Sequence, residues 1–382
     1  MEEWKECKLS DICDYGKDRI EVSSLDNSNY ISTENMLPNR AGITTATTLP
    51  TGELTPSFEI DDTLVSNIRP YFKKIWKATF SGGCSADVLV FKAKENVSKE
   101  YLYYVLADDE FFKYSMATSK GTKMPRGDKT SIMNYPVKLP PLPTQQKIAA
   151  ILSSLDDKIE LNNKINTNLE QQAGTLFKNW FVDFEPFGGK MPEGWKEADI
   201  YSIANIIYGS PFASKLFNTE KNGKPIIRIR DLKDQHSDVY TPEERDDAYL
   251  IQPKDIVVGM DGEFRPYIWG SEPGWLNQRV CVFENKRPKG KAFLFFSIKP
   301  LLDVVEKTQV ATTVIHIGKK DFDKFQITLP TEDILDKFDE LTDPILDQIV
   351  ENRLENRRLA ELRDTLLPKL MNGEIEVNEV RI

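Results

Sequence analysis

One segment, "SKGTKMPRGDK" at residues 119–129, gathers glycine, hydroxyl and cationic residues in a short stretch. A glycine-containing loop can bring backbone N–H groups to phosphate oxygens, and an arginine can donate two hydrogen bonds to a guanine edge. The residues expected to make such contacts are Lys120, Thr122, Lys123 and Arg126. The alternative is a solvated basic turn without a ligand.

Other cationic and polar residues could act in the same way. "NIRPYFKKIWK" at 67–77 and "GEFRPYIW" at 262–269 share the triplet RPY, while "RIRD" at 228–231 and "TQVATTVIHIGKK" at 308–320 belong to the second half. The tyrosines of the triplets are expected to pack rather than to bind. The candidate contacts are Arg69, Lys73, Lys74, Arg228, Arg230, Arg265, Gln309, Thr312, Thr313 and Lys319.

Catalytic chemistry finds little support in the sequence. His236 and His316 are the only histidines, no CxxC joins the four cysteines, and no G-x-x-x-x-G-K-[ST] loop occurs. We therefore expect no catalytic residue, metal or cofactor in this chain, and reduced cysteines in a cytoplasmic protein. The charged N-terminus lacks the apolar core of a signal peptide, and no apolar run is long enough to span a membrane.

The formal net charge of −10 looks unsuited to a nucleic-acid partner. The distribution of charge does not exclude nucleic-acid binding, because most of the acidic excess follows residue 331 while the two large segments before it are nearly neutral. A basic binding face must therefore be local.

The two halves of the chain repeat each other in order. Trp4 corresponds to Trp195, "YISTENM" at 30–36 to "IIRIRDL" at 226–232, and "NYPVKLP" at 134–140 to "KFQITLP" at 324–330, all at offsets of 190 to 196. The near-constant offset indicates an internal duplication. In each copy, β-type runs such as "DVLVF" and "RVCVF" alternate with turn signals. The segment 99–117 reads as one or two helices.

Each copy ends in a long helix, with Thr144 and Thr331 as expected N-caps. The apolar stripes advance by four and three residues, which is the coiled-coil period. The stripes are Ile148, Leu152, Leu155, Ile159, Asn162, Asn166, Leu169, Ala173 and Leu176, and Phe338, Thr342, Ile345, Ile349, Asn352, Asn356, Leu359, Arg363 and Leu366. Pro344 is expected to bend or restart the second helix.

The first helix leads from one copy to the other, so the second must run back if the two pack together. The pair is therefore expected to be antiparallel and pseudo-two-fold, with Asn162 and Asn166 near Asn352 and Asn356. Buried asparagines are best satisfied by one another, which penalises slips of register. The alternative is that they lie on a wet edge of the stripe.

The joins "VKLPPLPTQQKIAAILSSLDDKIE" and "LFKNWFVDFEPF", with "YISTENM", "DDTLVSNIRPYFKK" and "PRGDKTSIMNYPV", resemble the specificity subunit of type I restriction-modification systems. The second join, "TEDILDKFDELTDP", departs from the first by lacking its PPL and QQ. The resemblance implies two target recognition domains, each reading one half of a bipartite site on double-stranded DNA. It further implies a coiled coil that sets the spacer and docks two modification subunits.

The same resemblance implies that S-adenosylmethionine binds to the modification subunits, that ATP binds to restriction subunits, and that this chain is not catalytic. Trp180, Phe181 and Phe184 could be a docking surface for a modification subunit or a plug between helix and domain.

The expected fold class is α+β, with two similar mixed domains joined by two long helices in an antiparallel coiled coil. The expected segments are 1–143 and 188–330 for the recognition domains, 144–187 for the first helix with its linker, and 331–382 for the second helix with an acidic tail. The functional alternative is a coiled-coil interaction scaffold whose twin domains bind protein instead of DNA.

Overall fold

The computed structural model describes residues 4–308 and 316–380 of the chain. The chain divides into two compact units, the first formed by Met1–Asp157 with Ala360–Ile382 and the second by Lys158–Leu359. Each unit therefore contains one mixed domain together with a part of both long helices.

The mixed domain of the first unit has two four-stranded sheets and a two-stranded ribbon. The strand orders are β2-β9-β6-β7, β3-β5-β8-β4 and β1-β10. The strands are β1 (Lys5–Lys8), β2 (Cys13–Tyr15), β3 (Arg19–Glu21), β4 (Tyr30–Ile31), β5 (Leu54–Phe58), β6 (Thr63–Ser66), β7 (Ile75–Lys77), β8 (Gly82–Cys84), β9 (Val88–Ala93) and β10 (Pro136–Leu139). The helices of this domain are α1 (Leu9–Ile12), α2 (Lys99–Ala107), α3 (Asp109–Ala117) and α4 (Lys129–Ile132).

The mixed domain of the second unit has sheets of order β12-β19-β16-β17 and β14-β13-β18-β15 and the ribbon β11-β20. The strands are β11 (Lys196–Asp199), β12 (Ala204–Tyr208), β13 (Lys224–Ile227), β14 (Tyr240–Thr241), β15 (Leu250–Ile251), β16 (Ile256–Gly259), β17 (Pro266–Ile268), β18 (Gly274–Leu276), β19 (Val280–Asn285) and β20 (Gln326–Leu329). The helices are α6 (Ile229–Leu232), α7 (Lys291–Thr308) and α8 (Lys319–Phe322).

The strand pairings confirm the duplication. The antiparallel sheet β2-β9-β6-β7 has the order of β12-β19-β16-β17, and in the other sheet the parallel pair β4–β8 matches the parallel pair β13–β18. The copies differ at the two edges of this sheet, because β3 adds to β5 in the first domain whereas β14 adds to β13, the equivalent of β4 at the opposite edge, in the second. The common frame is thus two sheets and a ribbon, and the edge strand is variable.

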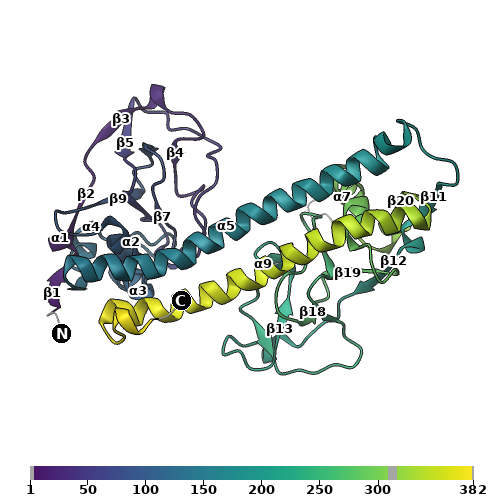
Figure 1. The fold of residues 1–382 in the computed structure, drawn as a ribbon. Coiled ribbons are helices and arrows are strands. Elements are labelled where there is room, and N and C mark those ends of the chain that lie inside the picture. Colours follow the sequence, from purple (N-terminus) through teal and green to yellow (C-terminus); the bar gives the residue numbers. More distant parts are fainter. Residues whose placement is uncertain (1–3, 309–315, 381–382) are drawn as a thin grey trace. The chain divides into compact units, whose positions relative to one another are not determined.

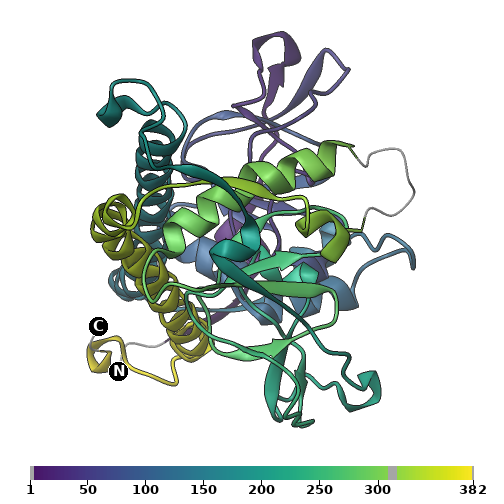
Figure 2. The ribbon, with the colours of Figure 1, turned by 90° about the vertical axis from the view of Figure 1, so that its right-hand side faces the viewer.

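Alternation along the strands explains why the central sheet is buried on both faces in the second unit. Ile256 and Val258 of β16 join the core beneath α7, whereas Val257 between them joins a second core with Leu276 and Trp269. Successive side chains of a strand point to opposite faces, so one sheet divides two cores. Figure 2 shows α7 in green beside the strands of this unit.

The segment 99–117 forms two helices because Asp108 adopts an extended conformation, with φ −62° and ψ 141°. Its carboxylate accepts a hydrogen bond from the backbone N–H of Glu110 at 3.0 Å and caps α3. The second copy has instead the single helix α7, which contains Pro300.

The two long helices are α5 (Leu142–Phe181) and α9 (Glu332–Asn372). α5 begins at Leu142, so the predicted N-cap Thr144 is wrong. Thr144 lies in the first turn, where its N–H bonds to the carbonyl of Pro141 at 2.9 Å. Thr331 does occupy the position before α9, and its hydroxyl donates to Asp333 at 2.6 Å. Of the two effects predicted for Pro344, a bend or a restart, the restart does not occur, since α9 continues through it.

Within the second unit, α5 and α9 lie side by side and run in opposite directions (Figure 1). The Nδ2 of Asn162 donates to Oδ1 of Asn356 at 2.9 Å, and the Nδ2 of Asn352 donates to Oδ1 of Asn166 at 2.8 Å. As the residue number rises along α5 from 162 to 166, the number of the bonded residue on α9 falls from 356 to 352, so the two helices are antiparallel. Asn162, Asn166 and Asn352 are buried, so the wet-edge alternative does not describe them.

Candidate nucleic-acid interface

The basic segment of the first unit forms a closed loop. The N–H of Lys120 donates to the carbonyl of Arg126 at 2.9 Å, and the N–H of Arg126 donates back to Lys120 at 3.0 Å. Thr122 and Lys123 lie between these bonds, and both are exposed. The four predicted contact residues therefore share one exposed loop.

This loop is fixed to the end of β6, which carries the second predicted segment. The N–H of Arg69 donates to the carbonyl of Pro125 at 2.8 Å, and the N–H of Gly127 donates to that of Asn67 at 3.1 Å. A Cβ at Gly127 would lie 2.7 Å from Oδ1 of Asn67 and 2.7 Å from Cδ1 of Ile132, so a larger residue would force these side chains to shift. The structure thus joins two segments whose hydrogen-bonded residues are 56 and 60 positions apart in sequence.

Arg69 itself takes a left-handed conformation, with φ 51° and ψ 65°, and precedes the short 3₁₀ turn Pro70–Phe72. Tyr71 in this turn is exposed, contrary to the expected packing role. Lys74 donates to the carbonyl of Thr33 at 2.6 Å, which fixes its ammonium against the neighbouring loop.

Carboxylates brace two cations of the basic loop. Lys120 Nζ lies 2.5 Å from Asp128, and Arg126 Nη2 lies 3.2 Å from Asp87. The hydrogen bond from Lys120, with further bonds from Ser131, lowers the pKa of Asp128 to about 2, so this carboxyl stays ionised at every physiological pH. Within residues 4–308 and 316–380, Lys123 makes no ion pair and is the freest cation of the loop.

Two hydrogen bonds of this crossing, at which residues 125–127 pass residues 67–69, recur in the described part of the second unit. The N–H of Asn67 donates to the carbonyl of Asp87 at 2.8 Å, and the N–H of Met260 donates to that of Arg279 at 2.9 Å. Likewise the N–H of Ile317 donates to Met260 at 2.9 Å, as that of Gly127 does to Asn67. The segments around residues 126 and 316 are therefore equivalent.

Three polar residues at this second crossing are absent from the predicted contacts. Arg279 Nε lies 3.5 Å from Asp261, and His316 Nδ1 lies 2.6 Å from the same carboxylate. The sequence offset of about 192 between β9 and β19 could have identified Arg279, because this residue occupies the position in the second copy that Asp87 occupies in the first.

The RPY triplets are not equivalent, which corrects the sequence alignment. Strand pairing matches Tyr267 in β17 with Trp76 in β7, whereas Tyr71 lies in the turn before β7. Arg265 also has a structural role, because Nη1 lies 2.5 Å from Glu306 and 3.1 Å from Asp303. The hydrogen bonds that Arg265 donates to Glu306 raise the pKa of this guanidinium, which remains cationic.

The remaining predicted contacts of the second unit differ in their surroundings. Arg228 is half-buried and bonds Asp231 through Nε at 2.8 Å and Nη2 at 3.0 Å, whereas Arg230 is exposed. Lys319 starts α8 and lies 2.8 Å from Asp323. Gln309, Thr312 and Thr313 lie outside the described residues.

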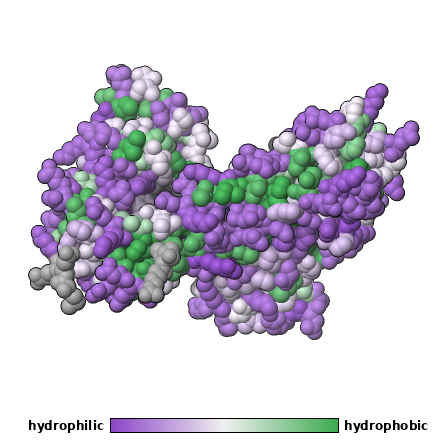
Figure 3. Space-filling model, in the orientation of Figure 1, coloured by the Kyte–Doolittle hydropathy of each residue, from purple (hydrophilic) through white to green (hydrophobic). Residues whose placement is uncertain are grey.

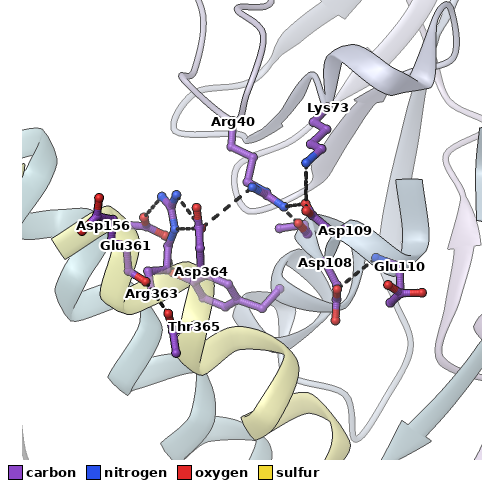
Figure 4. A network of polar contacts seen from close by, with 12 residues as sticks. Arg40, Lys73, Asp108, Asp109, Glu110, Asp156, Glu361, Arg363, Asp364 and Thr365 are labelled. Carbon is purple, nitrogen blue, oxygen red and sulfur yellow. Dashed lines mark hydrogen bonds and ion pairs between the residues drawn. The ribbon is translucent and has the colours of Figure 1, made fainter. Parts of the chain in front are cut away.

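A separate polar network ties the first mixed domain to its helices (Figure 4). Arg40, whose side chain is almost buried, donates to the carbonyl of Ala107 at 2.7 Å and pairs with Asp109 and Asp364. Lys73 joins this network, with Nζ 2.8 Å from Asp109. The ammonium of Lys73 is therefore directed to this network between domain and helices, and not to the basic loop.

The same network includes a charged position of the predicted stripe. Arg363 Nη1 lies 2.7 Å from Asp156, which accepts a hydrogen bond from the hydroxyl of Tyr104 at 2.8 Å. Burial lowers the pKa of Arg363, but Asp156 and Asp364 more than offset it and raise the pKa overall. The arginine is thus a largely buried, paired cation that joins α9, α5 and α2.

The aromatic cluster at the end of α5 belongs to the core of the second unit. Phe181 is buried, and its ring centroid lies 4.8 Å from that of Phe338 and 5.7 Å from that of Trp195. Trp180 and Phe184 are partly buried against the same core. This geometry matches the plug between helix and domain, and it leaves Phe181 too buried to form a docking surface.

In the described part of the chain, no group of three or more His, Cys, Asp or Glu residues is arranged to hold a metal ion. The described helices include none with enough length and apolar character to cross a membrane.

Comparison with known proteins shows which family the two repeated domains resemble. The family model described as type I restriction modification DNA specificity domain matches residues 1–171 and again 192–363. The Type I restriction enzyme HindI specificity subunit of Haemophilus influenzae is 26% identical, with 98% of this chain and 100% of the relative covered. The MjaIX specificity subunit of Methanocaldococcus jannaschii is 29% identical, with 75% and 71% covered.

Among solved structures, the type I restriction-modification system S subunit from M. genitalium has a TM-score of 0.59 at 15% identity, covering 97% of this chain and 96% of that one. This likeness concerns the fold. Because the family model matches both copies of the duplicated domain, the chain belongs to the family of type I restriction-modification DNA specificity subunits.

Proposed function

We propose that this chain reads a bipartite DNA sequence for a type I restriction-modification complex, with one half-site contacted by each mixed domain. The observation that carries the proposal is the repeated crossing, which holds an exposed polar loop against a strand end in the first unit and the segment at His316 and Ile317 against the equivalent strand end in the second. Phosphate contacts would fix the position of each domain, and base contacts would supply the sequence preference.

We further propose that the paired helices set the spacer between the half-sites. The asparagine contacts oppose a slip of α5 along α9, because a shifted pair would bury unpaired amides. Inserting one heptad in each helix adds about 10 Å at 1.5 Å per residue, or about three base pairs at 3.4 Å each.

The chemistry would come from partners. Modification subunits would bind S-adenosylmethionine and restriction subunits would use ATP, while this chain would contribute recognition in the cytoplasm. Figure 3 shows an apolar band on the exposed side of α5, and Leu161 and Ile165 are exposed large apolar residues of this helix. Such residues one turn apart suit a partner interface, and we propose them, instead of Phe181, as docking positions.

Exchange of residues 1–143 for the corresponding segment of another family member tests the modular reading. The chimera, assembled with its modification subunits, is expected to methylate sites changed in one half only, and a change in both halves would contradict the proposal. The wild-type complex provides the control. If it shows no sequence-dependent shift of DNA at low salt, the chain is a protein-binding scaffold instead.

A further inference from the structure

Both crossings present one arginine that a carboxylate holds from the side. In the first unit Arg126 comes from the loop and Asp87 lies just before β9. In the second, Arg279 lies just before β19 and Asp261 follows β16. The side chains of Arg126 and Arg279 are 56% and 55% exposed, so each is held on one side and open on the other.

The same three backbone positions supply these groups in both units. Isolated bridges pair Ile68 with Arg126 and Asp261 with His316, and the hydrogen bonds match Asp87 with Arg279. The arginine therefore lies in the loop in the first copy and at the start of the strand in the second. The carboxylate also differs in position, before β9 in the first copy and after β16 in the second. A fixed scaffold therefore carries the same guanidinium–carboxylate pair in two arrangements.

The chemistry of a braced arginine favours a base over a phosphate. A neighbouring carboxylate offsets the attraction of the guanidinium for an anion, whereas its free N–H groups can still donate to the neutral O6 and N7 of guanine. The carboxylate also restrains the guanidinium, through a hydrogen bond of 3.2 Å from Arg126 to Asp87 and an ion pair of 3.5 Å between Arg279 and Asp261, which also contacts His316. An unbraced cation such as Lys123 is better suited to a phosphate.

Resting on the proposed function, we infer that Arg126 and Arg279 are specificity-determining residues that each contact a guanine in the major groove of their own half-site. Asp87 and Asp261 are the positioning residues. Each half-site then contains at least one guanine whose recognition depends on one side chain of this chain.

The test measures methylation of a randomised DNA library by the full chain assembled with its modification subunits. Arg126→Gln is expected to weaken the preference for guanine at one position of one half-site by about ten-fold or more, and Arg279→Gln to do the same in the other half-site. Lys123→Gln is the matched control, expected to lower methylation of all sites without altering any base preference.

The outcomes separate the two levels of the proposal. A wild-type complex without any bipartite preference would refute the proposed function. A selective wild type whose Arg126→Gln and Arg279→Gln variants keep every base preference would overturn only the arginine assignment. Asp87→Asn keeps the guanidinium of Arg126 but removes the carboxylate that holds it. This variant should therefore weaken the guanine preference at the same base position as Arg126→Gln does. If Arg126→Gln does not fold, an unchanged preference in Asp87→Asn counts against the inference.

Discussion

The amide pair between Asn166 and Asn352 allows a quantitative test of how α5 and α9 are held in register. The two residues are 8% and 5% exposed, and the Nδ2 of Asn352 donates to Oδ1 of Asn166 at 2.8 Å. Asn352→Leu removes this donor and leaves a buried carbonyl oxygen unpaired, which costs about 1–3 kcal/mol. Asn166→Leu costs about as much, since it orphans the Asn352 amide and removes a donor to the carbonyl of Ile349.

The double variant removes both partners and places two apolar side chains on the stripe. Its cost should therefore fall below the sum of the single costs by at least about 1 kcal/mol. Hydrogen exchange of the backbone amides in α5 and α9 gives the local opening free energy of each variant. Asn168→Leu is the control, because Asn168 is exposed and bonds only Gln172 of its own helix among the described residues, so its effect should stay within about 0.5 kcal/mol. Strictly additive single costs would refute the reasoning.

Three further predictions concern charged groups. Burial raises the pKa of Asp339, whose side chain is 1% exposed, to about 6, so the folded state binds this proton more tightly than the unfolded chain. Stability should therefore fall by up to about 3 kcal/mol as pH rises from 4 to 6, and denaturant unfolding across this range should show a smaller fall in Asp339→Asn. Arg363→Met leaves Asp156 without its cation and should destabilise the first unit by about 3 kcal/mol, while Arg358→Met at an exposed position of α9 should change unfolding by less than about 0.5 kcal/mol. Lys123→Gln should reduce the salt dependence of DNA binding by about one unit of slope, as measured by titration at several salt concentrations, and an unchanged slope would remove Lys123 from the phosphate contacts.

The duplication and the long helices could be predicted because both leave periodic signals. The stripe from Ile148 to Leu176 fixes which face of α5 is inward, and the offset near 190 links β10 to β20. The strands "DVLVF" and "RVCVF" were found because buried β-strands are continuous apolar runs. These features depend on spacing, which a sequence records directly.

The candidate interface was only partly predictable, because a crossing joins segments that are distant in sequence. The RPY triplet suggested an equivalence between Arg69 and Arg265 that strand register does not allow. Arg279 was missed because it stands alone between a turn and a strand, without the basic neighbours that marked Arg126. Its role follows from a backbone hydrogen bond to Met260, and no local pattern reveals that bond.

The composition of the first compact unit has a consequence for biosynthesis. Residues from Ala360 onward complete this unit, yet the ribosome makes them after the entire second unit. Until then Asp156 lacks Arg363, and Arg40 lacks Asp364. We expect the second unit to mature first during translation, which reverses the usual N-to-C order, and a chain that stops before residue 360 to leave its leading half prone to proteolysis.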